Sequence, residues 1–297
     1  MKLIFLLFTL FFAFNTSAKT IEVIDDLGRA VRLEKPARRI ISLAPHITEN
    51  LFAAGAGEFI VGVVSYSDYP EQAKTIPQVG SYNNFNIETI LELKPDLIVG
   101  WKEGNQKKQV ELLMDMGFTV YINESTELEG IAKNIRHFGI LTEQDTVAAK
   151  ASNNFVERLS FLRETYSGEN KISVFYQTWN HPLITVNDQQ FIGRIIKLCG
   201  GQNIFADLNS LTPQVSAEAV IAKNPSVIIA SGMNEERPDW LDDWKEWSFL
   251  TAVKFDDLFF VPPDIIQRHS PRVLDGAQLI CKHLQGIRDR DIQASPD

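Results

Sequence analysis

Cysteine is scarce in this chain, whose 297 residues include only Cys199 and Cys281. Two cysteines with no histidine pattern near them do not make a structural zinc site, which takes four ligands. An even number of cysteines in an oxidising compartment favours one disulfide bond, and two buried free thiols are the alternative. A bond between them would fasten the last helix to the second half of the chain.

Long hydrophobic runs are absent beyond the first residues. One apolar run covers 3–14, after Lys2 and before the small and polar residues 15–18. A basic tip, a short apolar stretch and a small-residue site are typical of a secretory signal peptide. The run is shorter than the roughly 20 residues of a membrane-spanning helix, which argues against the alternative of a retained anchor. We therefore expect an exported, soluble protein cleaved after about Ala18, with no nearby cysteine to carry a lipid.

Positive charge and catalytic motifs are also lacking. The formal net charge is −9, which disfavours nucleic acid or an anionic membrane surface as a partner. The sequence has no nucleophile elbow, no glycine-rich phosphate loop and no paired His/Glu zinc motif. We therefore expect no enzyme activity, no cofactor and no metal site. The 44% hydrophobic and 23% charged residues are typical of a globular protein, and the length suits two domains.

A repeat is the most informative feature that the sequence does contain. The segments 87–99 and 217–229 both have an acidic residue at the start of a short helical pattern, then a proline, then an apolar run. Proline ends a helix and favours extended geometry in the residue before it. The apolar run suits a parallel strand that is covered on both faces. Two copies of this unit predict two similar α/β lobes, and the space between two lobes is a common place for a ligand cleft.

Between the two copies, strand signals vanish from about Glu129 to Tyr166. Apolar residues recur there every three or four positions, and a second, long helix is predicted from near Asp145. We predict an α/β fold of two Rossmann-like lobes with central parallel sheets, joined by a long α-helix, with a ligand cleft between them. The predicted divisions are a signal peptide (1–18), a first lobe (19–127), a linking helical segment (128–168), a second lobe (169–285) and a polar tail (286–297) that is disordered from Arg288 onward.

The chain resembles a known family over most of its length. It is similar to the periplasmic substrate-binding proteins of ABC importers whose lobes are joined by a helical backbone, and within that class to the cobalamin (vitamin B12)-binding proteins. The segments that carry the resemblance to the class are 25–29, 39–45, 48–49 and 94–98, and those that carry the resemblance to the cobalamin-binding members are 65–70, 199–205, 213–216 and 268–272.

The resemblance implies a set of ligand-binding residues. In the cobalamin-binding family, the matching positions that line the cleft are Tyr66, Tyr82, Trp101, Asp264 and Arg268. Tyr82 departs from the family pattern, which has a larger indole at this position. A corrinoid is a broad plane with a polar rim, so its site needs flat aromatic surfaces and a few polar groups.

Two further aromatic residues stand where predicted strands meet loops. Phe85 in the first lobe and Trp179 in the second are candidate ligand residues for this reason, although Trp179 lies one place from the aromatic of the family. Aromatic residues in such positions can also belong to the core, and for Tyr66, Trp101 and Trp179 that alternative stays open.

His46 is a candidate of a different kind. It follows the first buried strand, where the family often carries a small residue. A neutral imidazole at this place could ligate cobalt or haem iron, or donate a hydrogen bond to an amide of the corrin. A loop histidine that caps the following helix is the alternative. No histidine-rich pattern for a free metal ion is present, so any metal would arrive inside the ligand.

Glu88 and Glu218 occupy matching positions in the two copies of the repeat. A carboxylate at a helix start is stabilised by the helix dipole, which alone could explain both. The resemblance implies that they lie at the outer tips of the lobes and dock onto arginines of the permease. The expected partners are cobalamin and the ABC permease and ATPase complex of the inner membrane; the location is the periplasm and the protein a monomer. The alternatives are a receptor of the same class for haem or a ferric siderophore, an exported enzyme, and a structural or adhesive protein.

Overall fold

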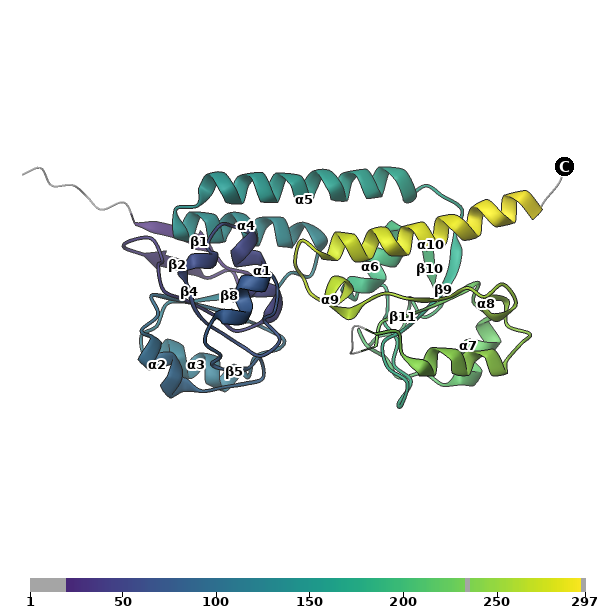
Figure 1. Ribbon diagram of the computed structural model, residues 1–297, viewed down its shortest axis with the longest axis horizontal. Helices are drawn as coiled ribbons and strands as arrows, with labels where there is room; N and C mark the ends of the chain where they lie inside the picture. The colour runs from purple at the N-terminus through teal and green to yellow at the C-terminus, as the bar shows by residue number, and fades with distance from the viewer. Residues whose placement is uncertain (1–19, 233–235, 295–297) are drawn as a thin grey trace, which may run out of the picture.

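The structure is a computed structural model that describes residues 20–232 and 236–294. The predicted signal peptide and its cleavage point lie outside these residues. Two lobes stand side by side, and one long helix, α5 (Asp145–Tyr166), passes over both (Figure 1).

The first lobe is built on a four-stranded sheet. Its order is β4-β3-β7-β8, and every neighbouring pair is parallel. Its strands are almost wholly buried, which explains why they read as apolar runs in the sequence. The elements of this lobe are β1 (Ile21–Ile24), β2 (Ala30–Leu33), β3 (Ile40–Ser42), α1 (Pro45–Ala53), β4 (Ile60–Val63), β5 (Gly80–Ser81), β6 (Asn84–Phe85), α2 (Ile87–Leu93), β7 (Leu97–Trp101), α3 (Lys107–Asp115) and β8 (Val120–Asn123), with the 3₁₀ turns η1 (Gly57–Phe59) and η2 (Glu71–Thr75).

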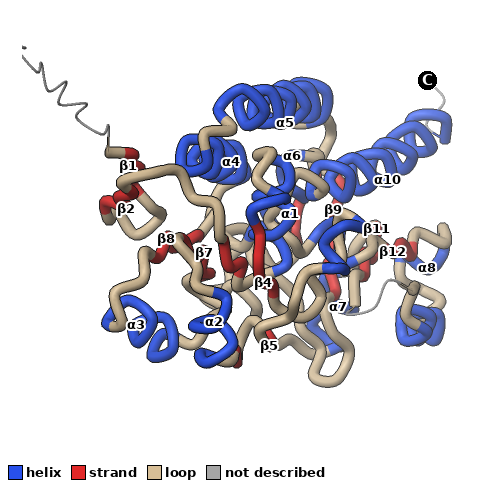
Figure 2. The backbone as a smooth tube through the Cα atoms, turned by 60° about the vertical axis from the view of Figure 1, so that its left-hand side comes forward, coloured by secondary structure: helices blue, strands red, loops and turns tan. Residues whose placement is uncertain are grey.

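The second lobe repeats this plan. Its sheet has the order β10-β9-β11-β12 and is again parallel throughout. In both lobes the strands of the four-stranded sheet lie between helices, whereas β1 and β2 lie at the outer edge of the first lobe (Figure 2). The predicted fold class is therefore confirmed. The elements are β9 (Ile172–Gln177), α6 (Phe191–Leu198), β10 (Gly201–Asn203), α7 (Ala217–Lys223), β11 (Val227–Ala230), η3 (Asp239–Glu246), α8 (Thr251–Lys254), β12 (Leu258–Phe260), α9 (Pro263–Ile266) and α10 (Val273–Ala294).

The sequence repeat corresponds to the units α2–β7 and α7–β11. The side chains of Asn86 and Ser216 cap the two helices by accepting a hydrogen bond from the backbone N–H three residues later. Both helices end in a left-handed residue, Lys94 (φ 46°) and Asn224 (φ 42°), directly before the proline. The expected extended geometry before the proline is therefore wrong, because a left-handed residue here lets its N–H satisfy a free carbonyl of the last helical turn.

Two antiparallel helices join the lobes. α4 (Leu128–Thr142) packs on α1 and β1 of the first lobe and along α5. Gly139 permits this close approach, because a Cβ atom at its position would lie 2.3 Å from that of Ala148 on α5. Further along, α5 packs on α6 and α10 of the second lobe. One hydrophobic cluster therefore runs through both lobes, including Ile47, Phe138, Phe155, Ile195 and Leu284.

The second lobe is tied together by the disulfide bond between Cys199 and Cys281. The bond joins the end of α6 to α10, as the sequence predicts. The predicted disorder from Arg288 onward is wrong for 288–294, since α10 continues to Ala294, and 295–297 lie outside the described residues. Arg288, which the sequence assigned to that tail, is buried and donates hydrogen bonds to the carbonyl oxygens of Cys199 and Asn170, both at 2.8 Å. Of the helices within 20–232 and 236–294, none has the length and apolar character to cross a bilayer.

Candidate ligand-binding site

Three of the predicted residues meet at the carboxyl edge of the first sheet. Trp101 ends β7, and its ring centroid lies 5.2 Å from that of His46 and 5.7 Å from that of Tyr82. Asn105 fixes this group, because its side chain accepts a hydrogen bond from the backbone N–H of Trp101 (2.6 Å) and donates one to the carbonyl of Tyr82 (2.6 Å). Tyr82 is 40% exposed, so part of this residue is accessible to a ligand.

Tyr66 stands on a tight turn after β4. The backbone N–H of Ser67 donates to the carbonyl of Val64 at 3.2 Å, and Tyr66 itself has a left-handed backbone (φ 66°). Its ring is 75% exposed, so the core alternative is excluded for this residue. A bulky residue in this conformation is strained, and such strain concentrates at ligand-binding positions.

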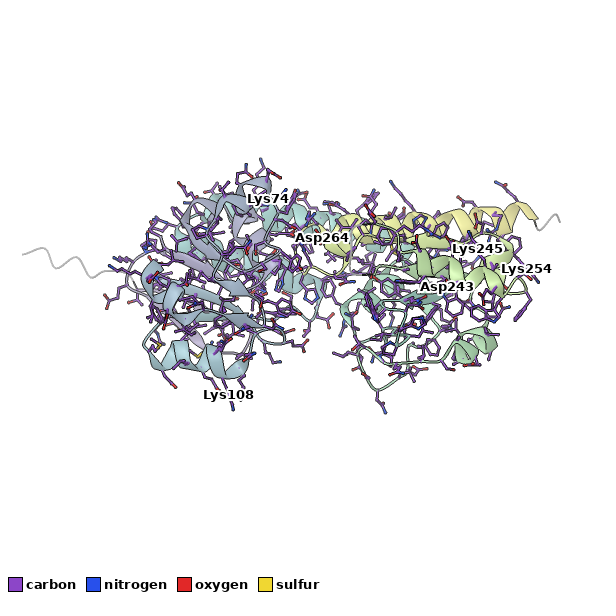
Figure 3. The ribbon with its side chains drawn as sticks, turned by 60° about the horizontal axis from the view of Figure 1, so that its bottom comes forward. Lys74, Lys108, Asp243, Lys245, Lys254 and Asp264 are labelled. Carbon is purple, nitrogen blue, oxygen red and sulfur yellow. A yellow bond between two sulfur atoms is a disulfide. The ribbon has the colours of Figure 1, made fainter. Side chains whose placement is uncertain are left out.

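Asp264 lies where the two lobes meet (Figure 3). It forms an ion pair with Arg268. The Nη2 atom of Arg268 lies 2.8 Å from Asp264, and its Nη1 atom lies 3.0 Å from Glu49 and 2.7 Å from Asp68 in the first lobe. The ion cluster of Glu49, Asp68, Asp264, Arg268 and Arg272, together with Asn50 and Ser270, is called the lobe junction below.

A second contact between the lobes joins two histidines. The ring of His46 lies 5.8 Å from that of His269, which stacks on Phe191 of α6 at 4.0 Å. Burial lowers the pKa of His46 to about 4, a shift that the hydrogen bond with Asn123 (3.0 Å) opposes and nearby Arg268 increases. Burial, and then the facing His46, lower the pKa of His269 to about 3. Both imidazoles are therefore neutral near pH 7.

Trp179 and Phe85 lie elsewhere. Trp179 follows β9 at the carboxyl edge of the second sheet, is 37% exposed, and donates from Nε1 to the carbonyl of His181 at 3.0 Å. In the described part of the chain, no ring contact joins it to the aromatic group of the first lobe. Phe85 is 3% exposed and packs in the core with Val79 and Ile90. Its prediction as a ligand residue is wrong, because the β5–β6 hairpin turns its side chain into the lobe.

Glu88 and Glu218 are both exposed and sit at the second position of α2 and α7. The free backbone N–H at the start of α7, and then the hydroxyl of Ser216, hold the pKa of Glu218 below its usual value. Both side chains are therefore accessible carboxylates on equivalent helices.

The hollows on the surface do not by themselves single out the site. One of about 790 Å³ lies beside α1, lined by Phe52, Tyr69, Ile76 and Arg272 among others, and holds none of the predicted ligand residues. Another of about 350 Å³ lies against Trp101 and α3. The convergence of aromatic rings, rather than hollow size, favours the edge of the first sheet. Within the described ranges, no group of three or more His, Cys, Asp or Glu side chains is placed to hold a metal ion.

Sequence reasoning missed the first-lobe half of the junction. Glu49 and Asn50 on α1 bind residues more than 200 positions away. The signal available was the pair Thr48-Glu49, which carried part of the family resemblance without a role. A buried glutamate is rare unless it is paired, and in the folded chain Glu49 is buried on α1 between the polar residues Thr48 and Asn50.

The structure has two similar α/β lobes joined by helices, with exposed aromatic rings at the edge of one sheet. The sequence contains no recognised catalytic motif. These features define a two-lobed ligand-binding protein. The profile of the periplasmic binding protein family matches residues 40–265. The chain belongs to this family, whose members are binding proteins and not enzymes, and the family implies a periplasmic location.

Within this family, the chain is similar to vitamin B12-binding proteins. The vitamin B12-binding protein of Vibrio cholerae is 40% identical over 251 residues, which are 84% of this chain and 90% of the relative. That of Vibrio campbellii is 37% identical, over 86% of this chain and 92% of the relative. The crystal structure of the periplasmic vitamin B12 binding protein BtuF of Vibrio cholerae superposes with a TM-score of 0.78 at 39% identity, covering 85% of this chain and 98% of that one. The periplasmic haem-binding protein RhuT from Roseiflexus sp. RS-1 (TM-score 0.73, 20% identity, 84% of this chain and 99% of that one) shares the fold.

Proposed function

We propose that this protein captures cobalamin between its two lobes in the periplasm and delivers it to an inner-membrane ABC transporter. The observation that carries the proposal is the set of aromatic residues at the carboxyl edge of the first sheet, where Tyr66 and Tyr82 are exposed and Trp101 is half-buried. The 40% identity to a vitamin B12-binding protein supports it. Cobalamin is then a transported ligand and not a cofactor.

The proposed binding mode follows from the chemistry of the residues. The rings offer flat apolar faces to the corrin, and burying such faces is the main favourable contribution in a largely preformed site. Arg268 and Asp264 supply the polar rim, and Trp179 faces the ligand from the second lobe. His46 is proposed to meet an amide of the corrin, because a neutral imidazole can donate or accept a hydrogen bond.

The proposed delivery cycle uses the rest of the chain. Residues 1–18 direct export and are removed, and the lobes 19–127 and 169–285 form the two walls, joined by 128–168. Glu88 and Glu218 dock the tips of the lobes onto the permease, and the protein acts as a monomer. Because one hydrophobic cluster runs through α5 and both lobes, closure is expected to be small.

The test is a calorimetric titration of the mature protein with cyanocobalamin, with haemin and a ferric siderophore as competitors. One-to-one binding at submicromolar strength, about −8 kcal/mol or better, is expected. The double variant Tyr66→Ala, Trp101→Ala should lose it. The control is Phe161→Ala, which removes an aromatic ring that is 62% exposed on α5. If the protein binds haemin but not cyanocobalamin, the proposal of cobalamin as the ligand is wrong, and a haem receptor with His46 as the axial ligand is favoured. If it binds none of the three compounds, the proposed function as a receptor for cobalamin, haem or a siderophore is wrong.

A further inference from the structure

We infer that Glu49 is a positioning residue that fixes the spacing of the two lobes and, through it, the place of Arg268. The inference about lobe spacing stands on the junction alone, and its consequence for affinity rests on the proposed function.

The first observation is that all four donors that bind the Glu49 carboxylate come from the second lobe. Arg268 Nη1 lies 3.0 Å from Oε1, Ser270 Oγ lies 2.6 Å from Oε2, and Arg272 reaches both oxygens, with Nε at 2.9 Å and Nη2 at 2.7 Å. The donors follow Glu49 by 219 to 223 residues. The side chain of Glu49 is only 2% exposed, so water does not replace these bonds.

The second observation is the charge balance around this carboxylate. Two guanidinium groups, of Arg268 and Arg272, meet on the single carboxylate of Glu49. Both are largely buried, with side chains 12% and 19% exposed. Asp68 and Asp264 also pair with Arg268, and Asp264 lies 3.9 Å from Arg272, so the two cations keep counterions if the Glu49 charge is removed. Glu49 is nevertheless the buried acceptor that binds both guanidinium groups, and its loss leaves their buried N–H donors without a partner, which is unfavourable. The segment that carries them is then expected to move away from α1, taking the second lobe with it.

The third observation is that the neighbours of Glu49 hold both lobes to the same helix turn. Thr48 hydrogen bonds to Ser67 (3.2 Å), beside the turn that presents Tyr66. Asn50 donates to the backbone carbonyl of His269 at 2.9 Å. Three consecutive residues of α1 therefore contact both lobes. Thr48 binds the turn that carries Tyr66 in the first lobe, and Glu49 and Asn50 bind residues 268–272 of the second. A shift at Glu49 would change the distance between the proposed ligand groups on the two sides.

The test measures the distance between the lobes directly. Lys108 on α3 and Lys254 on α8 are exposed and lie in different lobes (Figure 3), so the pair Lys108→Cys, Lys254→Cys accepts two nitroxide labels while the native cysteines stay bonded. Pulsed electron spin resonance then gives the distribution of distances without ligand. We expect Glu49→Gln to shift and broaden this distribution, whereas the control Glu92→Gln, which alters an exposed residue of α2 in the same lobe, leaves it unchanged.

The second readout is affinity for cyanocobalamin. Glu49→Gln should weaken binding about tenfold or more, and adding Arg268→Gln should weaken it little further, because both changes remove the same arrangement. A residue that only stabilised the fold would lower the melting temperature and leave the distances unchanged. If Glu49→Gln does not fold, Arg272→Gln removes two of the four bonds and answers the same question.

The outcomes separate the two proposals. An unchanged distance distribution in the Glu49→Gln or Arg272→Gln protein overturns the positioning role, whatever the affinity. If the wild-type protein does not bind cyanocobalamin, the proposed function fails, and the distance measurement still decides the role of Glu49.

Discussion

At the scale of single residues, burial controls the charge of the two histidines that meet between the lobes. His46 and His269 are enclosed by Trp101, Phe191 and Asn123, and the cation that faces His46 is Arg268. Within the described residues, neither ring is paired with a carboxylate that would compensate a proton. Protonation would therefore place positive charge in a buried contact between the lobes.

Acid is expected to destabilise the protein through these rings. The folded pKa of His46, about 4, is below the unfolded value of 6.5. The stabilising contribution is therefore fully present above pH 6.5 and is lost as the pH falls towards 4, by about 3 kcal/mol for His46. The free energy of unfolding, from urea titrations at pH 7, 5 and 4, should fall less in His46→Ala than in the wild type. An equal pH dependence in both proteins would contradict this assignment.

Tyr66 illustrates a conflict between stability and binding. Its left-handed backbone is strained, while its exposed ring adds little to the core. Tyr66→Gly should relieve the strain and stabilise the fold by about 1 kcal/mol, with loss of affinity for cyanocobalamin. Tyr66→Ala is the matched control, because it removes the ring and keeps the strain: it should lose affinity without gaining stability. Thermal unfolding and calorimetry on both variants give the two quantities, and a stabilised Tyr66→Ala protein would refute the strain argument.

At the scale of secondary-structure elements, local sequence information determines most of what could be predicted. The units α2–β7 and α7–β11 were predictable because their caps, prolines and apolar strands are all contiguous. The end of α10 was not, since its polar composition hides that Arg288 reaches back to Cys199 and Asn170. The burial of Phe85 was also not predictable from the local sequence. Phe85 lies in the two-residue strand β6, and only the way this strand pairs in the folded lobe decides that its side chain faces the core.

The disulfide bond is the clearest constraint on α10. It closes a loop of 82 residues between the end of α6 and the middle of α10. Removing such a constraint from the unfolded chain is expected to destabilise the protein by about 4 kcal/mol. The variant Cys199→Ala, Cys281→Ala should show this loss in thermal unfolding and retain its affinity for cyanocobalamin below the transition, because the bond lies away from the lobe junction. A loss of affinity in the folded variant would show that α10 also shapes the site.

At the scale of the whole molecule, the arrangement of the lobes depends on contacts that no local pattern encodes. The sequence indicates two lobes and a connecting helix, and it even marks Arg268, but it does not indicate that Glu49 and Asp68 bind this arginine. Such partners are separated by 200 residues or more, so only the folded chain brings them together. The similarity of the two lobes, by contrast, can be inferred from the repeat, because each copy is contiguous in the sequence.

The equivalent positions of Glu88 and Glu218 predict equal roles in docking. Each is an exposed carboxylate at the start of an equivalent helix, so a permease with two-fold symmetry would meet both in the same way. Glu88→Gln and Glu218→Gln should each reduce stimulation of the reconstituted transporter's ATPase to a similar degree, and the double variant should abolish it. Cyanocobalamin affinity should not change, and Glu164→Gln, which alters an exposed residue of α5, is the control.

Ionic strength distinguishes charge pairing from mere contact. Exposed ion pairs at the rim of an interface mainly affect association and are screened by salt, so wild-type stimulation should fall as salt increases, while the residual activity of each single variant should fall less steeply. Unequal effects of the two single variants would contradict the symmetric arrangement, because the same helix position would then contribute in only one lobe. Equal effects without any salt dependence would contradict the proposed ion pairs between Glu88 and Glu218 and the permease arginines. The two side chains would then contribute by packing at the interface and not by their charge.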